Sequence, residues 1–400
     1  MPVEKTVFLV GCSAEKLAGK HPAEALYSSE RFILARELVK ASDVDWAILS
    51  GRHGLIAPSR LTAAYDFDLR KAPTAAQAEW SAGVTETIRR KYRRKTRFVV
   101  IADESYYAGW LAEVSALGHT VFIPSLRCAK SGVSAWLRFS RPTDVKRKML
   151  EAVYACLSPL VTNAETFLSF QACKGGSLWP TAGVYLFFDT EQTRLFEASQ
   201  PKVIRVGTHG VSDGSISTLW QRLKAHKGDL NGLGNHRTSI FRLHVGTALI
   251  RRGKLSCPSW GSVERPSAKE LKSEADVERL VSDYIGRLHL CFLPITDPAS
   301  KRSDRAYVEQ NLIAIMSGPP GPVECAAEGW LGFDCTHRAV QSSSLWNVNH
   351  TEESFDPGFL KVLEHYVEVA RGRRAAGVES LAPANWYESS QHGFTQGFLF

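Results

Sequence analysis

A regular alternation of short apolar runs and helical segments over residues 1–125 constrains the fold of this chain more than any other feature. Nearly continuous apolar runs lie at 6–12, 45–51, 97–103 and 119–125. Such runs are typical of strands that are buried on both faces of a sheet. Their alternation with amphipathic helices predicts an α/β fold with a parallel, doubly wound sheet, whose ligands bind beyond the carboxyl ends of the strands.

The length of the chain predicts more than one domain, because 400 residues exceed what a single hydrophobic core usually supports. A predicted helix follows Pro142, and the turn-rich segment 173–183 completes the connection to a second domain. We therefore expect an α/β domain at 1–145, a helical connector at 146–180, a second domain at 181–375 and a C-terminal tail at 376–400.

Composition excludes several classes of protein. No apolar segment approaches the roughly 20 residues that cross a bilayer, so we expect no membrane-spanning helix. The apolar run at 6–12 follows an acidic residue and reads as a strand rather than a targeting segment, which predicts a cytoplasmic protein. The 8 cysteines form no CxxC pair, so we expect reduced thiols rather than a disulfide framework or a zinc ribbon.

The net charge of +8 favours a polyanionic partner. Basic residues gather in the run 89–97 and again in the predicted helix at 218–228. The first run has an equally good interpretation as a solvated helix end that precedes a strand. Charge alone therefore makes nucleic acid the first class of partner to consider, without selecting a surface.

The second half of the chain carries two short strand motifs and a basic helix. The triplet GVY occupies 183–185, and the triplet RVG occupies 205–207 in a second apolar strand. The helix that follows places Arg222 and His226 one turn apart, so both side chains lie on the same helix face. This order of tyrosine, tight glycine turn and cationic helix indicates a small catalytic module.

A later apolar helix at 304–318 carries Glu309, and Asn347 or Asn349 supplies a late asparagine. The whole order resembles that of the GIY-YIG endonucleases, and the Arg-x-x-x-His spacing resembles the restriction-enzyme branch of that family. The resemblance covers about 180–370 and implies an α+β nuclease domain with a small mixed or antiparallel sheet.

Phosphodiester hydrolysis gives each of these residues a chemical role, because it needs an activated water, charge stabilisation and help for the leaving oxygen. Glu309 is expected to hold one Mg²⁺ or Mn²⁺ as a hard oxygen ligand. Tyr185 is expected to take the proton of the attacking water, while His226 orients that tyrosine or relays a proton. Arg222 presents a planar guanidinium to the phosphate oxygens.

One position departs from the family pattern. Arg205 stands where the family has its second tyrosine, and a guanidinium cannot act as a base at neutral pH. His209 or Tyr307 is expected to fill that space; if neither does, the domain binds DNA without cutting it.

The connection between the basic helix and Glu309 is long. We predict a third strand at 234–246 and a loop that lies against DNA at 255–270. The expected DNA-binding residues are Arg205, Lys224, Arg237, Arg242, Asn347 and Asn349.

Polar residues also follow the first two strands of the N-terminal domain, at the sheet edge where an α/β fold makes its pocket. The expected pocket residues are Cys12, Ser13, Lys16, Tyr27, His53, Tyr65 and Asp66. The motifs CS..K, LY.S..F and YD..L resemble an uncharacterised bacterial α/β domain family. More distantly, they resemble the uracil-DNA-glycosylase-like domains of archaeosine tRNA-guanine transglycosylases.

This second resemblance implies a nucleobase pocket. Ser13, Tyr27 and His53 would read the edges of a base that is flipped out of the duplex, and Asp66 would activate a water or steady a developing sugar cation. The alternative is that His53 and Tyr65 pack a loop that Asp66 caps. A strand-end cysteine such as Cys12 is more often a small buried apolar residue than a nucleophile.

The sequence as a whole favours a metal-dependent DNA endonuclease that acts in phage defence against DNA with modified bases. Its partner would be double-stranded DNA, and an enzyme of the restriction type that cuts both strands would act as a homodimer. The alternatives are a DNA glycosylase that uses the N-terminal domain and a nucleic-acid-binding protein without catalytic activity.

Overall fold

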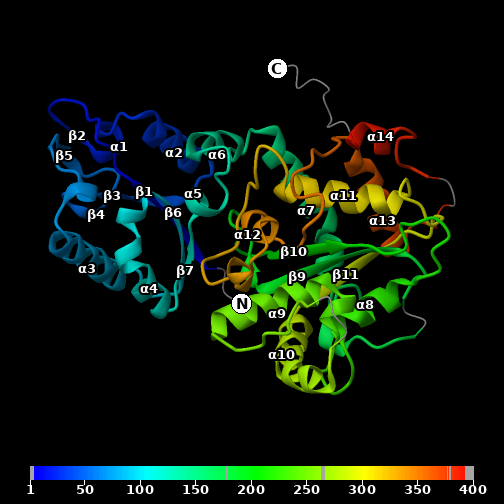
Figure 1. The fold of residues 1–400 in the computed structure, drawn as a ribbon. Coiled ribbons are helices and arrows are strands. Elements are labelled where there is room, and N and C mark those ends of the chain that lie inside the picture. The colour runs from blue at the N-terminus through cyan, green and yellow to red at the C-terminus, as the bar shows by residue number, and fades with distance from the viewer. Residues whose placement is uncertain (1–3, 177–178, 263–265, 376, 378–379, 392–400) are drawn as a thin grey trace. The chain divides into compact units, whose positions relative to one another are not determined.

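The computed structural model describes residues 4–176, 179–262, 266–375, 377 and 380–391, and its contacts divide the chain into two units (Figure 1). The N-terminal unit takes the chain up to Lys148 together with 193–200 and 323–328. The C-terminal unit takes 149–192, 201–322 and the chain from Gly329 onward. Two short segments of the second half of the sequence therefore belong to the first unit.

The N-terminal unit is built on a five-stranded sheet in the order β4-β3-β1-β6-β7. Four of its strands pair in parallel, and β4 pairs antiparallel with β3. The strands are β1 (Lys5–Gly11), β3 (Asp45–Ser50), β4 (Gly54–Ile56), β6 (Thr96–Ile101) and β7 (Thr120–Phe122). The parallel α/β sheet predicted from the apolar runs is thus confirmed, with the last strand shorter than expected because Pro124 begins a helix.

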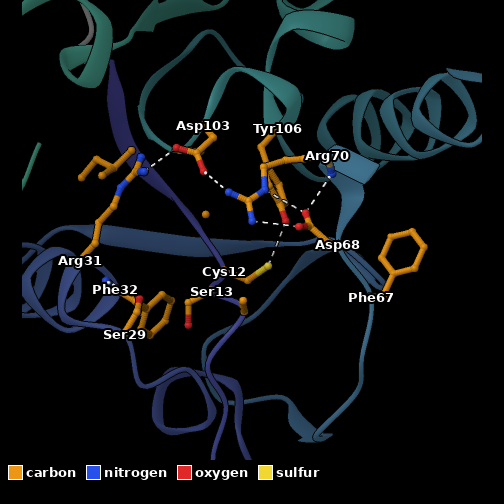
Figure 2. A pocket seen from close by; sticks show the side chains of 14 residues that line it. Cys12, Ser13, Ser29, Arg31, Phe32, Phe67, Asp68, Arg70, Asp103 and Tyr106 are labelled. Carbon is orange, nitrogen blue, oxygen red and sulfur yellow. Dashed lines mark hydrogen bonds and ion pairs between the residues drawn. The ribbon is translucent and has the colours of Figure 1, made fainter. Parts of the chain in front are cut away.

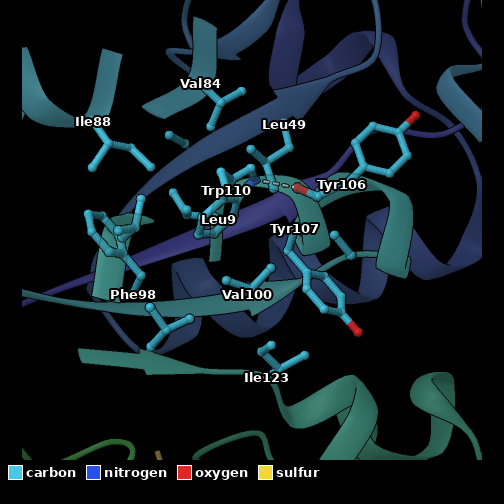
Figure 3. Packing of buried hydrophobic residues seen from close by; sticks show 14 of the residues in the cluster. Leu9, Leu49, Val84, Ile88, Phe98, Val100, Tyr106, Tyr107, Trp110 and Ile123 are labelled. Atoms are coloured by element: carbon cyan, nitrogen blue, oxygen red, sulfur yellow. Dashed lines mark hydrogen bonds between the residues drawn. The ribbon is translucent and has the colours of Figure 1, made fainter. Parts of the chain in front are cut away.

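Helices cover both faces of this sheet. On one face, Leu9 and Phe98 of the sheet pack with Val84 of α3 (Thr74–Lys91) and Trp110 of α4 (Ala108–Ala116) (Figure 3). Side chains alternate along a strand, so Phe8 points to the opposite face, where α2 (Glu30–Ala41) packs against β1. The smaller elements of the unit are β2 (Lys20–Pro22), α1 (Ala23–Leu26), β5 (Leu61–Ala63), η1 (Leu69–Lys71), η2 (Glu104–Tyr106), α5 (Pro124–Arg127) and α6 (Val133–Phe139).

A buried ion pair holds the two late segments together within the N-terminal unit. The guanidinium of Arg194 donates to the carboxylate of Glu324 through Nη2 at 2.9 Å and Nε at 3.2 Å, and the two side chains are 1% and 2% exposed. Arg97 of β6 donates to the backbone oxygen of Arg194. A buried bidentate pair is geometrically demanding, so it specifies how these segments are placed in their unit.

The C-terminal unit contains a four-stranded sheet in the order β10-β9-β11-β8. β11 (His289–Pro294) pairs antiparallel with β9 (Gly183–Thr193) and with β8 (Leu168–Ser169). β10 (Pro201–Gly207) follows β9 after a connection too short for a parallel crossover, so the two strands form a hairpin. The small antiparallel sheet expected for this domain is confirmed.

The elements around this sheet are helical. They are α7 (Val145–Val161), η3 (Phe170–Ala172), α8 (Leu219–Lys227), η4 (His236–Thr238), α9 (Ile240–Gly253), α10 (Ala268–Gly286), α11 (Asp304–Ser317), η5 (Leu331–Asp334), α12 (Arg338–Ser343), α13 (Phe359–Ala370) and α14 (Trp386–Gln391). None of the helices in the described part of the chain is long and apolar enough to cross a membrane.

The third strand predicted at 234–246 is wrong, because this segment forms η4 and the start of α9. Ser239 is the N-cap of α9 and accepts a hydrogen bond from the backbone N–H of Arg242. Phe241 and Val245 are then buried on one helix face. A serine cap followed by apolar residues four apart is a helix signal, and it outweighs the β-branched composition of the segment.

The loop predicted at 255–270 is shorter than expected, because α10 begins at Ala268 after a capping box made by Ser267 and Glu270. Residues 263–265 lie outside the described residues. Arg287 and Leu288 then connect α10 to β11.

The region predicted as a C-terminal tail is attached to the helix that carries Glu309. The carboxylate of Asp304 accepts hydrogen bonds from the backbone N–H groups of Leu381 at 2.7 Å and Ala382 at 3.0 Å, and from the Tyr366 hydroxyl at 2.6 Å. Trp386 packs against Tyr307 with ring centroids 5.2 Å apart. Asp304 is fully buried, so this segment is fixed to the first turn of α11.

We expect Asp304→Asn to lower the thermal unfolding temperature, because an amide nitrogen cannot accept from the donors that converge on this carboxylate. Each buried donor left without a partner costs about 1–3 kcal/mol. Calorimetry measures the loss, and faster tryptic cleavage after Arg373 or Arg374 would report release of the C-terminal segment. The exposed Asp276 offers the matched control, Asp276→Asn, and equal melting temperatures for both variants would contradict this account.

Candidate active site

The tyrosine of the first motif lies in a buried hydrogen-bonded chain. The hydroxyl of Tyr185, on the central strand β9, is 2.8 Å from Nε2 of His226 on α8. The other ring nitrogen of His226, Nδ1, is 2.7 Å from the Ser239 hydroxyl. Burial, and then the charges of nearby arginines, lower the pKa of His226 well below its usual value. The imidazole is therefore neutral and can exchange a proton with the tyrosine.

The glycines of the two strand motifs are required by close contacts. A Cβ at Gly207 would lie 2.3 Å from the Tyr185 hydroxyl, and a Cβ at Gly183 would lie 2.4 Å from the backbone oxygen of Leu293. Any side chain at these two positions would displace the tyrosine or separate β9 from β11. Gly207 thus makes room for the tyrosine, and Gly183 allows β9 to approach β11.

Arg222 lies on α8 and faces the same site. A capping box formed by Thr218 and Gln221 begins the helix. Burial is the largest cause of the lowered pKa of His226 and of His209, and the charge of the half-buried Arg222 adds to both shifts. Within the described residues this guanidinium makes no hydrogen bond or ion pair, so its donors are available to a substrate.

Glu309 lies on α11, and its Oε1 accepts a hydrogen bond from the backbone N–H of Thr208 at 3.2 Å. Thr208 directly follows β10, so the half-buried carboxylate lies at the end of the second motif strand. Burial raises the pKa of Glu309, and the charges of His350, Arg205 and Arg222 oppose that rise.

These contacts link the predicted catalytic residues to the β9–β10 hairpin. Tyr185 and His226 are in direct contact, and Glu309 is bonded to the residue that follows the second motif strand. The charge of Arg222 acts on both His226 and Glu309.

The side chains around Glu309 can be compared with the ligands that a divalent cation requires. No group of three or more metal-ligating side chains occurs among the residues that the structure describes. A single carboxylate is nevertheless a sufficient protein ligand for Mg²⁺, which usually keeps several waters and binds through one or two carboxylates and the substrate phosphate. Thr208 engages only Oε1 of Glu309, so the remaining oxygen is compatible with such an ion and not with a closed protein cage.

Arg205, at the position of the family's second tyrosine, is a buried cation. Its Nη1 donates to the backbone oxygen of Trp346 at 2.5 Å, and its guanidinium carbon lies 4.7 Å from the ring centroid of Phe241. The charge of Arg205 lowers the pKa of both His226 and Glu309. Being 5% exposed, it supports the site electrostatically and does not face DNA as predicted.

Only one of the two ring nitrogens of His209 has a hydrogen-bond partner among the described residues. Its Nδ1 is 3.4 Å from the Ser217 hydroxyl, whereas its buried Nε2 has no hydrogen-bond partner. Burial and the charges of Arg305 and Arg222 lower the pKa of His209 to about 4. Tyr307, the alternative for this space, instead donates its hydroxyl to Asp356 at 2.7 Å.

Other predicted DNA contacts are engaged within the protein. The guanidinium of Arg242 is fully buried and pairs with Glu278 at 2.5 Å, and Arg237 pairs with Glu274 at 2.8 Å. The sequence does not indicate these ion pairs, because Glu274 and Glu278 lie on α10, 37 and 36 residues after their arginines. These positions correct the expectation that both arginines face DNA, whereas Lys224 is exposed.

The two candidate asparagines have different surroundings. Asn347 is buried, and its amide bonds the backbone of β10, accepting from Val206 N–H at 3.0 Å and donating to Val206 oxygen at 2.7 Å. Asn347 therefore fixes the second motif strand and does not contact DNA. Asn349 is exposed and stays a predicted DNA contact.

The sequence reasoning missed His350, which follows the two asparagines. Its Nδ1 lies 2.9 Å from both carboxylate oxygens of Glu353, and this contact and the charge of Glu309 raise the pKa of His350. Its backbone has a left-handed φ of 61°, which is uncommon for a histidine. His350 directly follows Asn349, and both candidate asparagines were predicted to lie near the site. That proximity was the sequence signal that could have indicated His350.

The predicted N-terminal pocket residues divide into three groups. Cys12 and Ser13 line one cavity, and His53 and Asp66 line another. Tyr27 is buried, and its hydroxyl lies 3.3 Å from that of Ser50. The single pocket expected from the sequence is therefore replaced by two cavities.

The remaining predicted pocket residues, Lys16, Tyr27 and Tyr65, form a cluster of contacts that also includes Cys12. The Tyr65 hydroxyl lies 3.1 Å from that of Tyr27, and 3.7 Å from the sulfur of Cys12. Lys16 places its Nζ 4.3 Å from the ring centroid of Tyr65. Because Tyr27 is 1% exposed, it cannot read a base edge as predicted.

Comparison with known families agrees with the geometry of the C-terminal unit. A family model described as "GIY-YIG domain" matches residues 144–372, which is more than half of the chain. A second model, described as a family of unknown function (DUF6884), matches residues 7–138. That match gives no support to the resemblance to uracil-DNA-glycosylase-like domains. No curated protein and no solved structure gives a significant match.

We expect Asn347→Ala to destabilise the protein, because the change removes both hydrogen bonds to Val206. A buried backbone group without a partner costs about 1–3 kcal/mol. Urea unfolding followed by tryptophan fluorescence measures the loss. Asn349→Ala is the matched control and should unfold at nearly the wild-type urea concentration, so an equal loss in both variants would argue against this role.

Acidification should destabilise the protein partly through His209. The pKa of this histidine is about 4 in the folded state, below its ordinary value of 6.5, so the unfolded chain takes up the proton first. The neutral form of His209 therefore contributes fully to the free energy of unfolding above pH 6.5. This contribution, up to about 3 kcal/mol, is lost as the pH falls toward 4. Unfolding free energies of His209→Gln should depend less steeply on pH across this window. Parallel pH profiles for the variant and the wild type would refute the assignment.

Proposed function

The chain belongs to the GIY-YIG family, and we propose that it is a metal-dependent endonuclease that hydrolyses phosphodiester bonds in double-stranded DNA. The observations that carry this proposal are the Tyr185–His226 hydrogen bond and the bond between Glu309 and Thr208 at the end of the second motif strand, with the charge of Arg222 acting on His226 and Glu309. Each of these side chains supplies a different requirement of the reaction, and no one of them would suffice alone.

Tyr185 acts as the general base in this proposal, with His226 as its proton partner. When Nε2 of His226 accepts from the tyrosine, Nδ1–H donates to Ser239. The tyrosine hydroxyl is then polarised toward the imidazole, and its oxygen can take a proton from a water as its own proton moves to Nε2. The low pKa of His226 keeps the imidazole neutral at neutral pH, so that Nε2 can accept the hydrogen bond of the tyrosine. The same burial and cations make the imidazolium unfavourable, so in this proposal the proton stays on His226 only transiently.

Arg222 and Arg205 stabilise negative charge in this proposal, from two different positions. The unpaired guanidinium of Arg222 presents its fork to the phosphate oxygens, where charge increases in the transition state. Arg205 stays buried and contributes a fixed positive charge near His226 and Glu309. Replacement of the second tyrosine by this arginine is therefore compatible with cleavage.

Glu309 would hold Mg²⁺ or Mn²⁺ through the carboxylate oxygen that Thr208 leaves unengaged. The bound ion would supply Lewis-acid stabilisation of the phosphate and the leaving oxygen. The backbone N–H of Thr208 orients the carboxylate at 3.2 Å, and the nearby cations favour its ionised form. His209 and His350 border this arrangement and would orient solvent or substrate.

We further propose that the enzyme acts in phage defence against DNA with modified bases, as a homodimer when it cuts both strands. The pairing of a nuclease domain with a second unit that has cavities at its strand ends supports this biological role. The exposed Lys224 and Asn349 are the remaining proposed DNA contacts in the C-terminal unit.

Cleavage of plain and base-modified duplexes, with Mg²⁺ and with EDTA, tests the proposal. Glu309→Gln keeps an acceptor for Thr208 but removes the charge, and we expect loss of cleavage by about 100-fold or more. Tyr185→Phe should lower the rate by about 100-fold or more through loss of the base. Glu364→Gln changes an exposed glutamate on α13 and should cut at the wild-type rate.

Two outcomes would replace the proposal with one of its alternatives. Tight, salt-sensitive DNA binding by the wild-type protein without cleavage would identify a non-catalytic binding protein. Abasic sites that accumulate in EDTA would identify a glycosylase. Cleavage by Glu309→Gln at the wild-type rate would overturn the assignment of this carboxylate.

A further inference from the structure

The cavity at the carboxyl ends of β1 and β6 lies at the topological switch point of the N-terminal sheet. The chain passes from β1 to its neighbour β3 on one side, and then returns to β6 on the other side of β1. Open α/β sheets bind ligands in the crevice where the strand order reverses. A cavity of ≈ 280 Å³ occurs there, lined by residues that follow both strands, including Ser13 and Asp103.

Two guanidinium groups converge on this cavity from separate elements. Arg31 comes from the first turn of α2, and Arg70 comes from η1 (Figure 2). Both contact Asp103, Arg31 through Nη1 at 2.5 Å and Arg70 through Nη1 at 3.8 Å. Arg70 also pairs with Asp68 at 2.9 Å. A carboxylate held between two guanidinium forks occupies a position that suits a phosphate group.

These charged groups remain accessible. The side chains of Arg31, Arg70 and Asp103 are 33%, 53% and 45% exposed, so a ligand can reach them and Asp103 can move aside. Each guanidinium has five N–H donors. Asp103 engages one donor of Arg31 in a hydrogen bond, and Asp68 engages Nε and Nη2 of Arg70. Donors are therefore left over for an incoming anion.

The cavity also offers an apolar surface next to the charged groups. Phe67 lines it with 39% of its surface exposed, directly before Asp68 in the chain. Phe32 of α2 lines the cavity from another element. An exposed ring in the lining of a cavity that also holds two arginines fits a ligand with both a flat aromatic part and an anionic part.

We propose that this cavity binds a phosphorylated nucleoside, with the phosphate between Arg31 and Arg70 in place of Asp103 and the base against Phe67. The shared chemistry is a nucleoside 5′-phosphate, which exists both as a free nucleotide and at a 5′-phosphorylated DNA end. The site is made by the N-terminal unit alone, so the proposal does not depend on the nuclease activity assigned to the other unit.

Isothermal titration calorimetry on the full-length protein in EDTA tests this site. The probes are inorganic phosphate, the four deoxynucleoside 5′-monophosphates, and a trinucleotide with and without a 5′-phosphate. Arg31→Ala and Arg70→Ala should each weaken monophosphate binding about tenfold or more. Arg90→Ala changes an exposed arginine at the end of α3 and should leave the affinity unchanged.

Three further measurements separate the parts of the proposal. Phe67→Ala should weaken binding of the nucleotides but not of inorganic phosphate, and Asp103→Asn should tighten binding of both. Tighter binding of the phosphorylated trinucleotide than of its unphosphorylated form, lost in Arg70→Ala, would identify a DNA end as the source. Binding of the free monophosphates without that difference would identify a free nucleotide.

The proposal would be overturned if no probe binds, if binding is equal in the wild type and both arginine variants, or if Asp103→Asn weakens it. Thermal unfolding verifies that each variant is folded. Where an alanine variant does not fold, the corresponding lysine variant keeps the charge but loses the fork, and its affinity should still fall. Failure here would leave the cleavage results for Glu309→Gln unaffected, so the two proposals fail separately.

Discussion

The contact between the Tyr185 hydroxyl and Gly207 fixes the arrangement of the candidate active site. Because a Cβ at position 207 would lie 2.3 Å from that hydroxyl, the second strand motif must end in glycine for the first motif to place its tyrosine. The same hydroxyl reaches His226, and His226 reaches the serine that begins α9. One tyrosine thus connects two strands and two helices, and the polar groups that we propose for catalysis are also part of the folded core.

Buried positive charge is the second constraint on this site. Burial is the largest cause of the low pKa of His226, and the charges of Arg205, Arg222 and Arg242 lower it further. Arg242 is neutralised by Glu278, whereas Arg205 pairs only with a backbone oxygen and an aromatic ring among the contacts described. A cation of this kind is costly to bury. Its cost is reduced when a carboxylate or a phosphate lies nearby, which is the situation that Glu309 and a bound substrate would create.

The sequence was sufficient to predict the elements that have strong local signals. The buried strands of the first domain appear as apolar runs, and the order of Tyr185, Arg222 and Glu309 was enough to indicate the family. The segment after α8 was misread because IFRLHVG fits either a strand or a helix, and only the cap at Ser239 distinguishes them. Periodicity alone does not separate such short apolar segments.

Partners distant in the sequence explain the remaining errors. Arg242 was expected at the surface because its carboxylate partner lies 36 residues away. Asn347 was expected to contact DNA because nothing local indicates its bonds to Val206. In the N-terminal unit, the groups expected to form one pocket lie around two cavities. The charged lining of the first, Arg31 with Arg70 and Asp103, comes from two helix starts and a loop that carry no local sequence signal of a pocket.

The assignment of 193–200 and 323–328 to the N-terminal unit has a consequence for how this protein can be divided. The ion pair between Arg194 and Glu324 lies inside that unit, although both residues are encoded within the nuclease half. Neither half of the gene therefore contains a complete N-terminal unit. A single cut in the gene therefore cannot separate the two units, because the segments 193–200 and 323–328 would stay with the C-terminal part.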